Sequence, residues 1–490
     1  MNPEKKKPRK FDRNLIVIGA GAGGLVSAYI AAAVKAKVTL IEKHKMGGDC
    51  LNTGCVPSKA LIRSARFLAQ ARRAREFGFD AAPVEFDFAR IMQRVQSVIE
   101  KVEPHDSVER YTSLGVDVIE GEARVRSPFE VEVNGRTLTA RHIIIATGAR
   151  PFVPAIPGLD ELDYLTSDTV WQLRTLPKRL LVLGGGPIGC ELAQSFARFG
   201  ADAGSKVIMV QRGARLMNRE DENVSTLIAG QFEREGIELR LNHAAEAFRQ
   251  EGARKYLVAE HQGRTIEIEF DQVLLALGRS ANVSGFGLEE LGVKLSSRKT
   301  IEVNEFLQTN YPNIYACGDV AGPYQFTHTA AHQAWYASVN ALFSPFKKFR
   351  VDYSVIPFAT FTDPEVARVG LNEREAKAQG MAYEVTHYGL DDLDRAIADG
   401  ETQGFIKVLT APGKDKILGV TIAGEHAGDL IAEFVMAMRH GLGLNKILAT
   451  IHIYPTWMEA NKFAAGNWKK AHAPTKLLQW VERFHGWRRG

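Results

Sequence analysis

The chain has 490 residues, of which 45% are hydrophobic and 24% are charged, and its formal net charge is +5 at pH 7. These values are typical of a globular protein of several domains. Much of the positive charge lies at residues 5–10, and no apolar stretch follows this run, so we expect that it is not a signal peptide. We expect residues 1–11 to form a disordered basic tail that does not bind nucleic acid. No stretch approaches the ~20 apolar residues of a membrane-spanning helix.

The first motif along the chain predicts a dinucleotide-binding unit. A short apolar strand at residues 15–18 runs into a glycine-rich turn and an Ala-rich helix. Gly19 allows the turn, Gly21 allows a phosphate to approach closely, and Gly24 allows the helix to pack on the strand. The next strand ends in Glu42, which is placed to bind a ribose hydroxyl.

The second motif predicts a pair of reactive thiols. Cys50 and Cys55 are separated by four residues in the Gly-rich bend GGDCLNTGCVPSK. Pro57 suits the first turn of a helix, so we expect Cys55 just before a helix N-terminus, where the helix dipole favours a thiolate. A zinc site would need two further ligands at matching spacing. A structural disulfide is disfavoured because the chain has four cysteines and no secretory signal. The thiols therefore indicate a redox centre in a reducing cytoplasm.

The dinucleotide pattern then repeats about 165 residues further on. A strand at 180–183 leads into the turn at 184–189, a helix at 190–199 and a strand at 206–210. Two such units imply two dinucleotides. Together with a reactive dithiol, they suggest electron transfer from a nicotinamide, through a flavin, to a disulfide.

The end of the second dinucleotide-binding motif bears on the choice of nicotinamide nucleotide. Gln211 stands where an acidic residue would bind the 2′-hydroxyl of NADH, and Arg212 and Arg215 follow. Arginines favour the 2′-phosphate of NADPH, so we expect NADPH, with NADH as the alternative. The competing interpretation is that both arginines simply face solvent.

The remaining chain predicts two domain joints and a C-terminal domain. Residues 146–158 and 276–282 follow apolar strands and are expected to join domains. A further strand at 313–320 ends in Gly-Asp, where Asp319 either takes a ribityl hydroxyl or forms an ordinary turn. From about residue 351, β-rich runs and then helices at roughly 429–440 and 443–450 predict a separate α+β domain.

With these motifs in hand, the chain resembles the flavin-dependent pyridine nucleotide-disulfide oxidoreductases, the group that holds glutathione reductase, dihydrolipoamide dehydrogenase and mercuric reductase. The resemblance covers roughly residues 12–465 and rests on GAGAGG, GGDCLNTGCVPSK, ATG, GGGPIG, LGR and ACGD in this order. It implies an α/β fold with two Rossmann-like dinucleotide-binding domains, for FAD and NAD(P)H, and a C-terminal α+β dimerisation domain. It also implies a homodimer in which the partner subunit completes each active site.

The expected domain limits follow from the joints and the resemblance. They are a basic tail at 1–11, the FAD-binding domain at 12–155, the NAD(P)H-binding domain at 156–280, a second FAD-binding or central part at 281–351, the dimerisation domain at 352–470, and an amphipathic C-terminal helix at 471–490.

The resemblance also implies roles for individual residues. Cys50 would be the interchange thiol that meets the acceptor, and Cys55 would face the flavin in a charge-transfer complex. Lys59 would lie near the flavin N5 edge and pair with Glu191, although an ordinary exposed salt bridge is the alternative. The FAD-binding set would be Gly19, Gly21, Gly24, Glu42, Gly48, Thr147, Gly148, Gly318 and Asp319. The nicotinamide nucleotide would be bound by Gly184, Gly186, Gly189, Arg212, Arg215 and Gly278. No resident metal site is expected.

The C-terminal motif departs from the family pattern. Glu459 keeps its place, but Tyr454 stands where glutathione reductase and dihydrolipoamide dehydrogenase carry a catalytic histidine. A phenol of pKa ~10 is a poorer proton shuttle at neutral pH than an imidazole of pKa ~6.5. His452 either substitutes in part or only packs locally.

In carrying a tyrosine near this position, the chain resembles a mercuric-reductase-like branch of the family. The C-terminal cysteine pair of that group is, however, missing from this sequence. Three acceptor hypotheses follow: a disulfide or other thiol-reactive compound, a metal ion such as Hg(II) or Cu(II), or a role as flavin redox carrier or sensor. The C-terminal tail has an apolar helical stripe and several arginines. Its residues 476–489 either dock on the dimer or contact a membrane surface or a partner.

Overall fold

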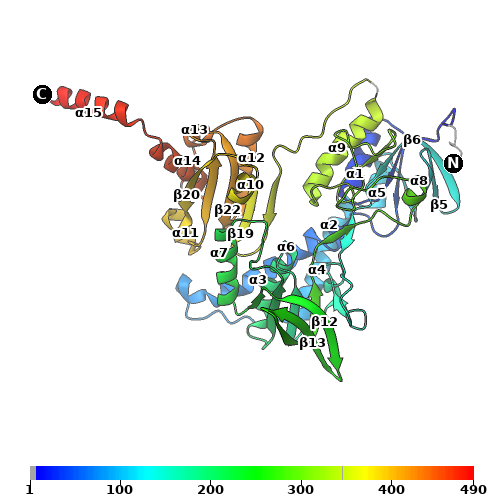
Figure 1. Ribbon diagram of the computed structural model, residues 1–490, viewed down its shortest axis with the longest axis horizontal. Coiled ribbons are helices and arrows are strands. Elements are labelled where there is room, and N and C mark those ends of the chain that lie inside the picture. The colour runs from blue at the N-terminus through cyan, green and yellow to red at the C-terminus, as the bar shows by residue number, and fades with distance from the viewer. Residues whose placement is uncertain (1–6, 345) are drawn as a thin grey trace. The chain divides into compact units, whose positions relative to one another are not determined.

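The computed structural model describes residues 7–344 and 346–490, so part of the expected basic tail lies outside the described residues. The chain divides into two compact units (Figure 1). The first unit consists of Met1–Arg72, Ala82–Arg212 and Asn242–Asp352. The second unit consists of Arg73–Ala81, Gly213–Leu241 and Tyr353–Gly490.

The first sheet of the first unit has the order β3-β2-β1-β6-β5-β4, and β17 also pairs with β6. Leu15, Ile16 and Val17 of its central strand are fully buried, as in parallel sheets that are covered on both faces. The strands are β1 (Arg13–Ile18), β2 (Val38–Glu42), β3 (Asp117–Glu120), β4 (Arg124–Ser127), β5 (Glu130–Val133), β6 (Arg136–Ile145) and β17 (Ile314–Ala316). The first unit also contains the helices α1 (Ala22–Ala33), α2 (Gly48–Asn52), α3 (Cys55–Arg72), α4 (Phe88–Val102), α5 (Val108–Ser113), α8 (Leu288–Leu291) and α9 (Thr327–Phe343).

A second group of parallel strands in the same unit pairs in the order β10-β9-β15-β8. Its strands are β8 (Tyr164–Leu165), β9 (Arg179–Leu183), β10 (Lys206–Gln211) and β15 (Gln272–Leu275), and α6 (Pro187–Gly200) follows β9. An antiparallel sheet adds β12 (Ala244–Glu251), β13 (Arg254–His261) and β14 (Arg264–Phe270), and β7 (Ala149–Pro151) pairs with β16 (Arg279–Ala281). The first unit therefore contains two strand-turn-helix motifs, one at β1–α1 and one at β9–α6.

The second unit is built on an antiparallel sheet of order β18-β19-β22-β21-β20. Ile406, Val408 and Ile422 of its central strands pack with Phe434 into one core. The strands are β18 (Pro357–Thr360), β19 (Glu365–Gly370), β20 (Glu384–Gly389), β21 (Phe405–Thr410) and β22 (Ile417–Gly424). The other elements are α7 (Glu222–Arg234), β11 (Glu238–Leu241), α10 (Glu373–Ala378), α11 (Asp394–Asp399), α12 (Ala427–Arg439), α13 (Leu444–Ala449), α14 (Glu459–Ala471) and α15 (Thr475–Arg489).

The predicted fold class is confirmed: a mixed α/β protein with two dinucleotide-binding motifs and a C-terminal α+β domain. Two local expectations differ from the structure. The cysteine bend is a short helix, α2, because Gly47 takes the left-handed φ of 84° that turns the chain into it. The strand expected at 313–320 spans only Ile314–Ala316, because the chain turns next, with the Ala321 N–H bonded to the Gly318 carbonyl. Among the described residues, no helix is long and apolar enough to cross a membrane.

Candidate active site

The first glycine turn is shaped by close backbone contacts. Gly19 has a φ of +99°, and a side chain there would collide with the carbonyl of Ala146. A side chain at Gly24 would collide with the carbonyl oxygen of Gly19, so α1 can pack on the strand only without one. Gly21 is the N-cap of α1, and no side chain caps this helix. An uncapped N-terminus behind a tight glycine turn fits the pyrophosphate of a dinucleotide such as FAD.

Glu42 closes the same turn from the end of β2. Its Oε2 accepts the N–H of Ala20 at 2.6 Å, and its Oε1 accepts the N–H of His44 at 2.8 Å. These bonds fix the carboxylate beside the turn, where the sequence predicts a ribose contact. Gly48, at the start of α2, stands directly against Gly21, and Gly47 donates its N–H to the carbonyl of Ala20 at 2.9 Å. The helix that carries Cys50 is thus attached to the first turn.

Asp319, which the sequence also predicts to bind FAD, lies in a group of charged side chains. Asp319 pairs with Arg279 at 3.4 Å, and Arg279 also pairs with Asp49. Burial raises the pKa of Asp319, and the positive charge of Arg279 opposes this rise. Thr147 donates its hydroxyl to the carbonyl of Asn282 at 2.7 Å, and Asn282 returns a bond to the Thr147 carbonyl. The sequence did not single out Arg279, Asp49 or Asn282 as site residues.

The second glycine turn repeats the first with one substitution. Gly189 would clash with the carbonyl of Gly184 if it carried a side chain, and Gly186 is the uncapped N-cap of α6. Gln211 ends β10, and its Oε1 accepts the N–H of Gly185 at 3.0 Å. A neutral amide therefore stands where the first turn has a carboxylate.

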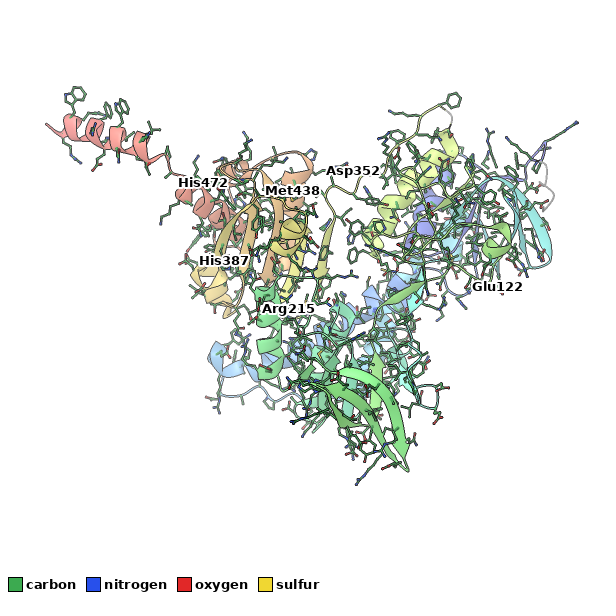
Figure 2. The ribbon with its side chains drawn as sticks, in the orientation of Figure 1. Glu122, Arg215, Asp352, His387, Met438 and His472 are labelled. Atoms are coloured by element: carbon green, nitrogen blue, oxygen red, sulfur yellow. The ribbon has the colours of Figure 1, made fainter. Side chains whose placement is uncertain are left out.

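Gly278, Arg212 and Arg215, which the sequence also predicts to bind the nicotinamide nucleotide, lie in different segments of the chain. Gly278 follows β15, and Arg212 follows Gln211 and is exposed. Arg215 belongs to the second unit, in the segment that precedes α7 (Figure 2).

The pKa values of the two redox cysteines are shifted in opposite directions. Cys50 lies in α2 and Cys55 is the first residue of α3, and both are free thiols. The hydrogen bond from Cys50 lowers the pKa of Cys55 to about 6, helped by the hydroxyl of Thr327 and the charge of Lys59. The same hydrogen bond, with burial, raises the pKa of Cys50. The pair therefore favours the anion at Cys55 over the anion at Cys50.

An ion pair between a partly exposed lysine and a buried glutamate lies close to this dithiol. Lys59 Nζ is 3.0 Å from Glu191 Oε2, and only 8% of the Glu191 side chain is exposed. Lys59 is one turn after Cys55 on α3, and Glu191 is the fifth residue of α6, so the pair connects the helix of the dithiol with the helix of the second glycine turn. The structure thus brings together Cys50, Cys55, Lys59 and Glu191. Thr327, whose hydroxyl is 3.4 Å from Cys55, was missed because it lies 272 residues away in the sequence.

The C-terminal candidates belong to the second unit. Tyr454 is 67% exposed, and its hydroxyl donates to Asp394 at 3.0 Å, which raises the pKa of the phenol. The ring of His452 is buried, with Nε2 3.0 Å from Glu433 and Nδ1 3.0 Å from the carbonyl of Thr450. His452 therefore does not share the exposed face of Tyr454.

Glu459 is also buried, at the start of α14, and its Oε2 accepts the N–H of Thr456 at 3.4 Å. This bond stays within the local turn, so Glu459 contributes to the shape of the segment that holds Tyr454. Among the described residues, no group of three or more His, Cys, Asp or Glu side chains is arranged to hold a metal ion.

Comparison with known proteins agrees with this arrangement. The family model described as pyridine nucleotide-disulphide oxidoreductase matches residues 13–334, and its dimerisation domain matches residues 356–465, which supports a homodimer. The chain is 36% identical to a mercuric reductase of Lysinibacillus sphaericus over 92% of this chain and 82% of the relative. It is 35% identical to a dihydrolipoyl dehydrogenase of Chlamydia muridarum over 91% of this chain and 94% of the relative.

Solved structures give the same result. The Cu(II) complex of the HOCl-induced flavoprotein disulfide reductase RclA from Escherichia coli matches with a TM-score of 0.81 at 27% identity, covering 92% of this chain and 98% of that one. LpdA from Mycobacterium tuberculosis matches with a TM-score of 0.83 at 26% identity, covering 92% and 99%. The chain therefore belongs to the pyridine nucleotide-disulphide oxidoreductases, enzymes that use FAD and a pyridine nucleotide.

Proposed function

We propose that this enzyme passes electrons from NADPH to the Cys50–Cys55 pair and from there to a thiol-reactive acceptor. Bound FAD would supply the two-electron exchange between the nicotinamide and the dithiol. The observation that carries the proposal is the polarised pair itself: the Cys50 thiol hydrogen-bonds Cys55 and lowers its pKa to about 6. A stabilised anion at Cys55 and a protonated Cys50 match a division between a flavin-facing and an acceptor-facing thiol.

For a disulfide acceptor, the thiols would do the chemistry in two exchanges. Cys50 gives its proton to Cys55 and attacks one sulfur of the acceptor, forming a mixed disulfide and releasing a thiolate. Cys55 gives its proton to the released thiolate and attacks Cys50, so that the Cys50–Cys55 disulfide forms and a second thiolate leaves, which takes a proton from water. The balance is one disulfide, one NADPH and one proton consumed, with two thiols and NADP⁺ produced.

A metal ion is the second candidate acceptor, favoured by the residue that replaces the usual histidine. A leaving thiolate needs a proton donor, whereas a soft cation bound by two cysteine sulfurs does not. Asp394 raises the pKa of Tyr454, which makes its phenol a still weaker shuttle at neutral pH. Mercuric reductases among the relatives and a Cu(II) complex among the similar structures point the same way.

The first test is rapid mixing of the FAD-loaded enzyme with NADPH. Wild type should develop a long-wavelength thiolate–flavin charge-transfer band, and Cys55→Ser should not, while Cys190→Ser serves as the matched control because Cys190 is fully buried. A wild-type enzyme without this band would contradict the proposal.

The two acceptor classes separate with a Tyr454→His variant assayed on small disulfides and on Hg(II) and Cu(II). If the missing imidazole limits disulfide exchange, the variant gains disulfide activity and leaves metal reduction unchanged. No gain on disulfides supports the metal ion.

The preference for NADPH is also part of the proposal, because Gln211 presents an amide and Arg212 is exposed beside it. The wild-type KM for NADPH should be lower than that for NADH.

For helix α15, we propose contact with an anionic membrane surface, with the enzyme located in the cytoplasm. No residue of this helix is buried, Leu477, Trp480 and Trp487 are all more than half exposed, and Arg488 and Arg489 add positive charge at its end. Exposed aromatic and cationic side chains on one helix suit the interface of anionic lipids. The full chain should sediment with phosphatidylglycerol vesicles and not with phosphatidylcholine vesicles, and removal of residues 475–490 should abolish this. Unchanged sedimentation after truncation would contradict the contact.

A further inference from the structure

The short helix α2, which carries Cys50, is held at both ends by side chains from distant parts of the sequence. Arg279 pairs with Asp49 near its beginning, and Trp171 donates a hydrogen bond to Thr53 at its end. We call these two contacts the α2 clamp. All of its residues belong to the first compact unit. The clamp thus fixes the helix of one of the two redox thiols.

Arg279 anchors the beginning of the helix. Its guanidinium forms an ion pair with the carboxylate of Asp49, which is the second residue of α2 and directly precedes Cys50. The same guanidinium pairs with Asp319 at 3.4 Å and donates to the carbonyl of Ala149 at 2.9 Å. Only 16% of the Arg279 side chain is exposed. A planar guanidinium that has three fixed partners sets the direction of the Asp49 side chain as well as its distance.

Trp171 anchors the end of the helix. It lies in the short helix η3 (Val170–Gln172), and its indole N–H is shared between the carbonyl of Thr53 at 2.9 Å and the carbonyl of Ser167 at 2.7 Å. Thr53 is the C-cap residue of α2. The last carbonyls of a helix have no partner within the helix, so a donor from elsewhere in the chain fixes the place of that end.

The backbone between the two cysteines leaves little room for α2 to shift. Asn52 donates its side-chain amide to two carbonyls of the same bend, each at 2.9 Å. A side chain at Gly54 would lie 2.9 Å from the carbonyl oxygen of Asp49, so the end of α2 packs closely against the start of α3. The position of α2 therefore decides how Cys50 meets Cys55. A disulfide closes only within a narrow range of Cβ–Cβ distances, and a strained one is easier to reduce.

We propose that the α2 clamp positions Cys50 for closure of the disulfide with Cys55. The inference rests on the proposed redox role of the two thiols, and Asp49, Arg279 and Trp171 are positioning residues in it. The stability of a disulfide depends on the effective concentration of one thiol beside the other. Release of either end of α2 should lower this concentration and shift the equilibrium toward the open dithiol.

The test is the anaerobic equilibrium of the FAD-loaded enzyme with mixtures of reduced and oxidised dithiothreitol at pH 7, with the free cysteines alkylated and located by mass spectrometry. Oxidised dithiothreitol takes two electrons and two protons from the enzyme thiols as the enzyme disulfide forms. Trp171→Phe keeps an aromatic ring and removes the N–H, so the constant for disulfide formation should fall about tenfold, which corresponds to about 30 mV. Asp49→Ala should give a similar fall, whereas Asp49→Glu can still pair with Arg279 and should retain most of the wild-type constant.

Asp160→Ala is the matched control, because it removes the same charge at an exposed position. It should leave the constant unchanged. Trp171→Phe should keep its full flavin content, and it decides the test alone if Asp49→Ala fails to fold or to bind FAD. A wild-type constant in a folded clamp variant would overturn the inference while leaving the redox role of the thiols intact. A wild-type enzyme in which Cys50 and Cys55 form no disulfide at any ratio of the two reagents would instead contradict the proposed function, and the inference with it.

Discussion

The two glycine turns of this chain share a backbone and differ in what surrounds it. Both place an uncapped helix N-terminus behind a turn that excludes side chains. The first turn is closed by the carboxylate of Glu42, and the helix of Cys50 is attached to it through Gly47. The second is closed by the amide of Gln211, and a side chain added at Gly186 would have no atom of the described residues within 4 Å. The common backbone suits a dinucleotide, while the closing side chain and its neighbours suit a resident flavin in one case and an exchangeable nucleotide in the other.

The largest expected effect comes from filling either turn. Gly24→Val should give protein without FAD, because the side chain would displace α1 from the Gly19 carbonyl. Gly189→Val, the equivalent change in the second turn, should keep FAD and lose reduction by NADPH. Flavin absorbance per subunit and anaerobic bleaching by NADPH measure the two effects. Gly486→Ala is the control, since a side chain there meets open space. Loss of FAD in Gly189→Val would contradict the assignment of the two turns.

A smaller effect is expected from making the two turns alike. If Gln211 faces the 2′-position of the nucleotide as proposed, Gln211→Glu places a carboxylate there, so the ratio of the KM values should shift toward NADH by about tenfold, or ~1.4 kcal/mol. The FAD content should not change. Steady-state kinetics with both nucleotides measure this shift. Gln194→Glu on α6 is not a suitable control, because Gln194 is buried. Gln272→Glu, at a partly exposed position of β15, is the matched control. A variant that keeps its NADPH preference would show that Gln211 does not select the nucleotide.

The smallest effect concerns the dithiol attached to the first turn. Because the pKa of Cys55 is lowered to about 6, the charge-transfer band of the reduced enzyme should be full above that pH and fade as the pH falls through it. Cys50→Ala removes the main cause of the lowered pKa, so the midpoint should move to higher pH. Absorbance between about pH 4.5 and 9 follows the titration from below the lowered pKa of Cys55 to above the ordinary thiol pKa of about 8.5, in the NADPH-reduced wild type and in the variant with its flavin oxidised. Identical midpoints in wild type and variant would show that Cys50 does not stabilise the thiolate.

Local patterns in the sequence were enough to predict both turns, because glycine spacing and the flanking strands lie within about 25 residues. The pairing of Lys59 with Glu191 came from the family resemblance, since nothing local connects two residues on different helices. Thr327 escaped prediction because only the folded sheet brings α9 beside Cys55.

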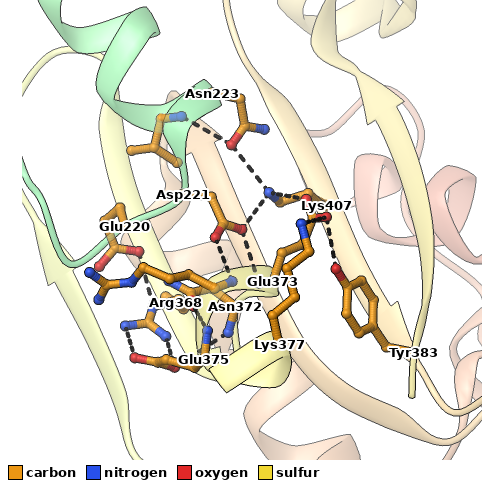
Figure 3. Close-up of polar contacts among 12 residues, drawn as sticks. Glu220, Asp221, Asn223, Arg368, Asn372, Glu373, Glu375, Lys377, Tyr383 and Lys407 are labelled. Atoms are coloured by element: carbon orange, nitrogen blue, oxygen red, sulfur yellow. Dashed lines mark hydrogen bonds and ion pairs between the residues drawn. The ribbon is translucent and has the colours of Figure 1, made fainter. Parts of the chain in front are cut away.

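The helical form of the cysteine loop also escaped prediction. The glycines at 47 and 48 suggested a bend, yet they start a helix. The hydrogen bonds that join residues 219 and 221 to the start of α10 (Figure 3) could not be read from the sequence either, because their partners lie 153 residues further along the chain.

The account depends most on the claim that Cys50 and Cys55 receive the electrons of the pyridine nucleotide. Anaerobic alkylation of the oxidised, FAD-loaded enzyme before and after one equivalent of NADPH tests it directly, with the labelled cysteines located by mass spectrometry. NADPH should add label at Cys50 and Cys55 alone, because Cys190 and Cys317 are buried and burial raises the pKa of both. Labelling that does not change with NADPH would contradict the account.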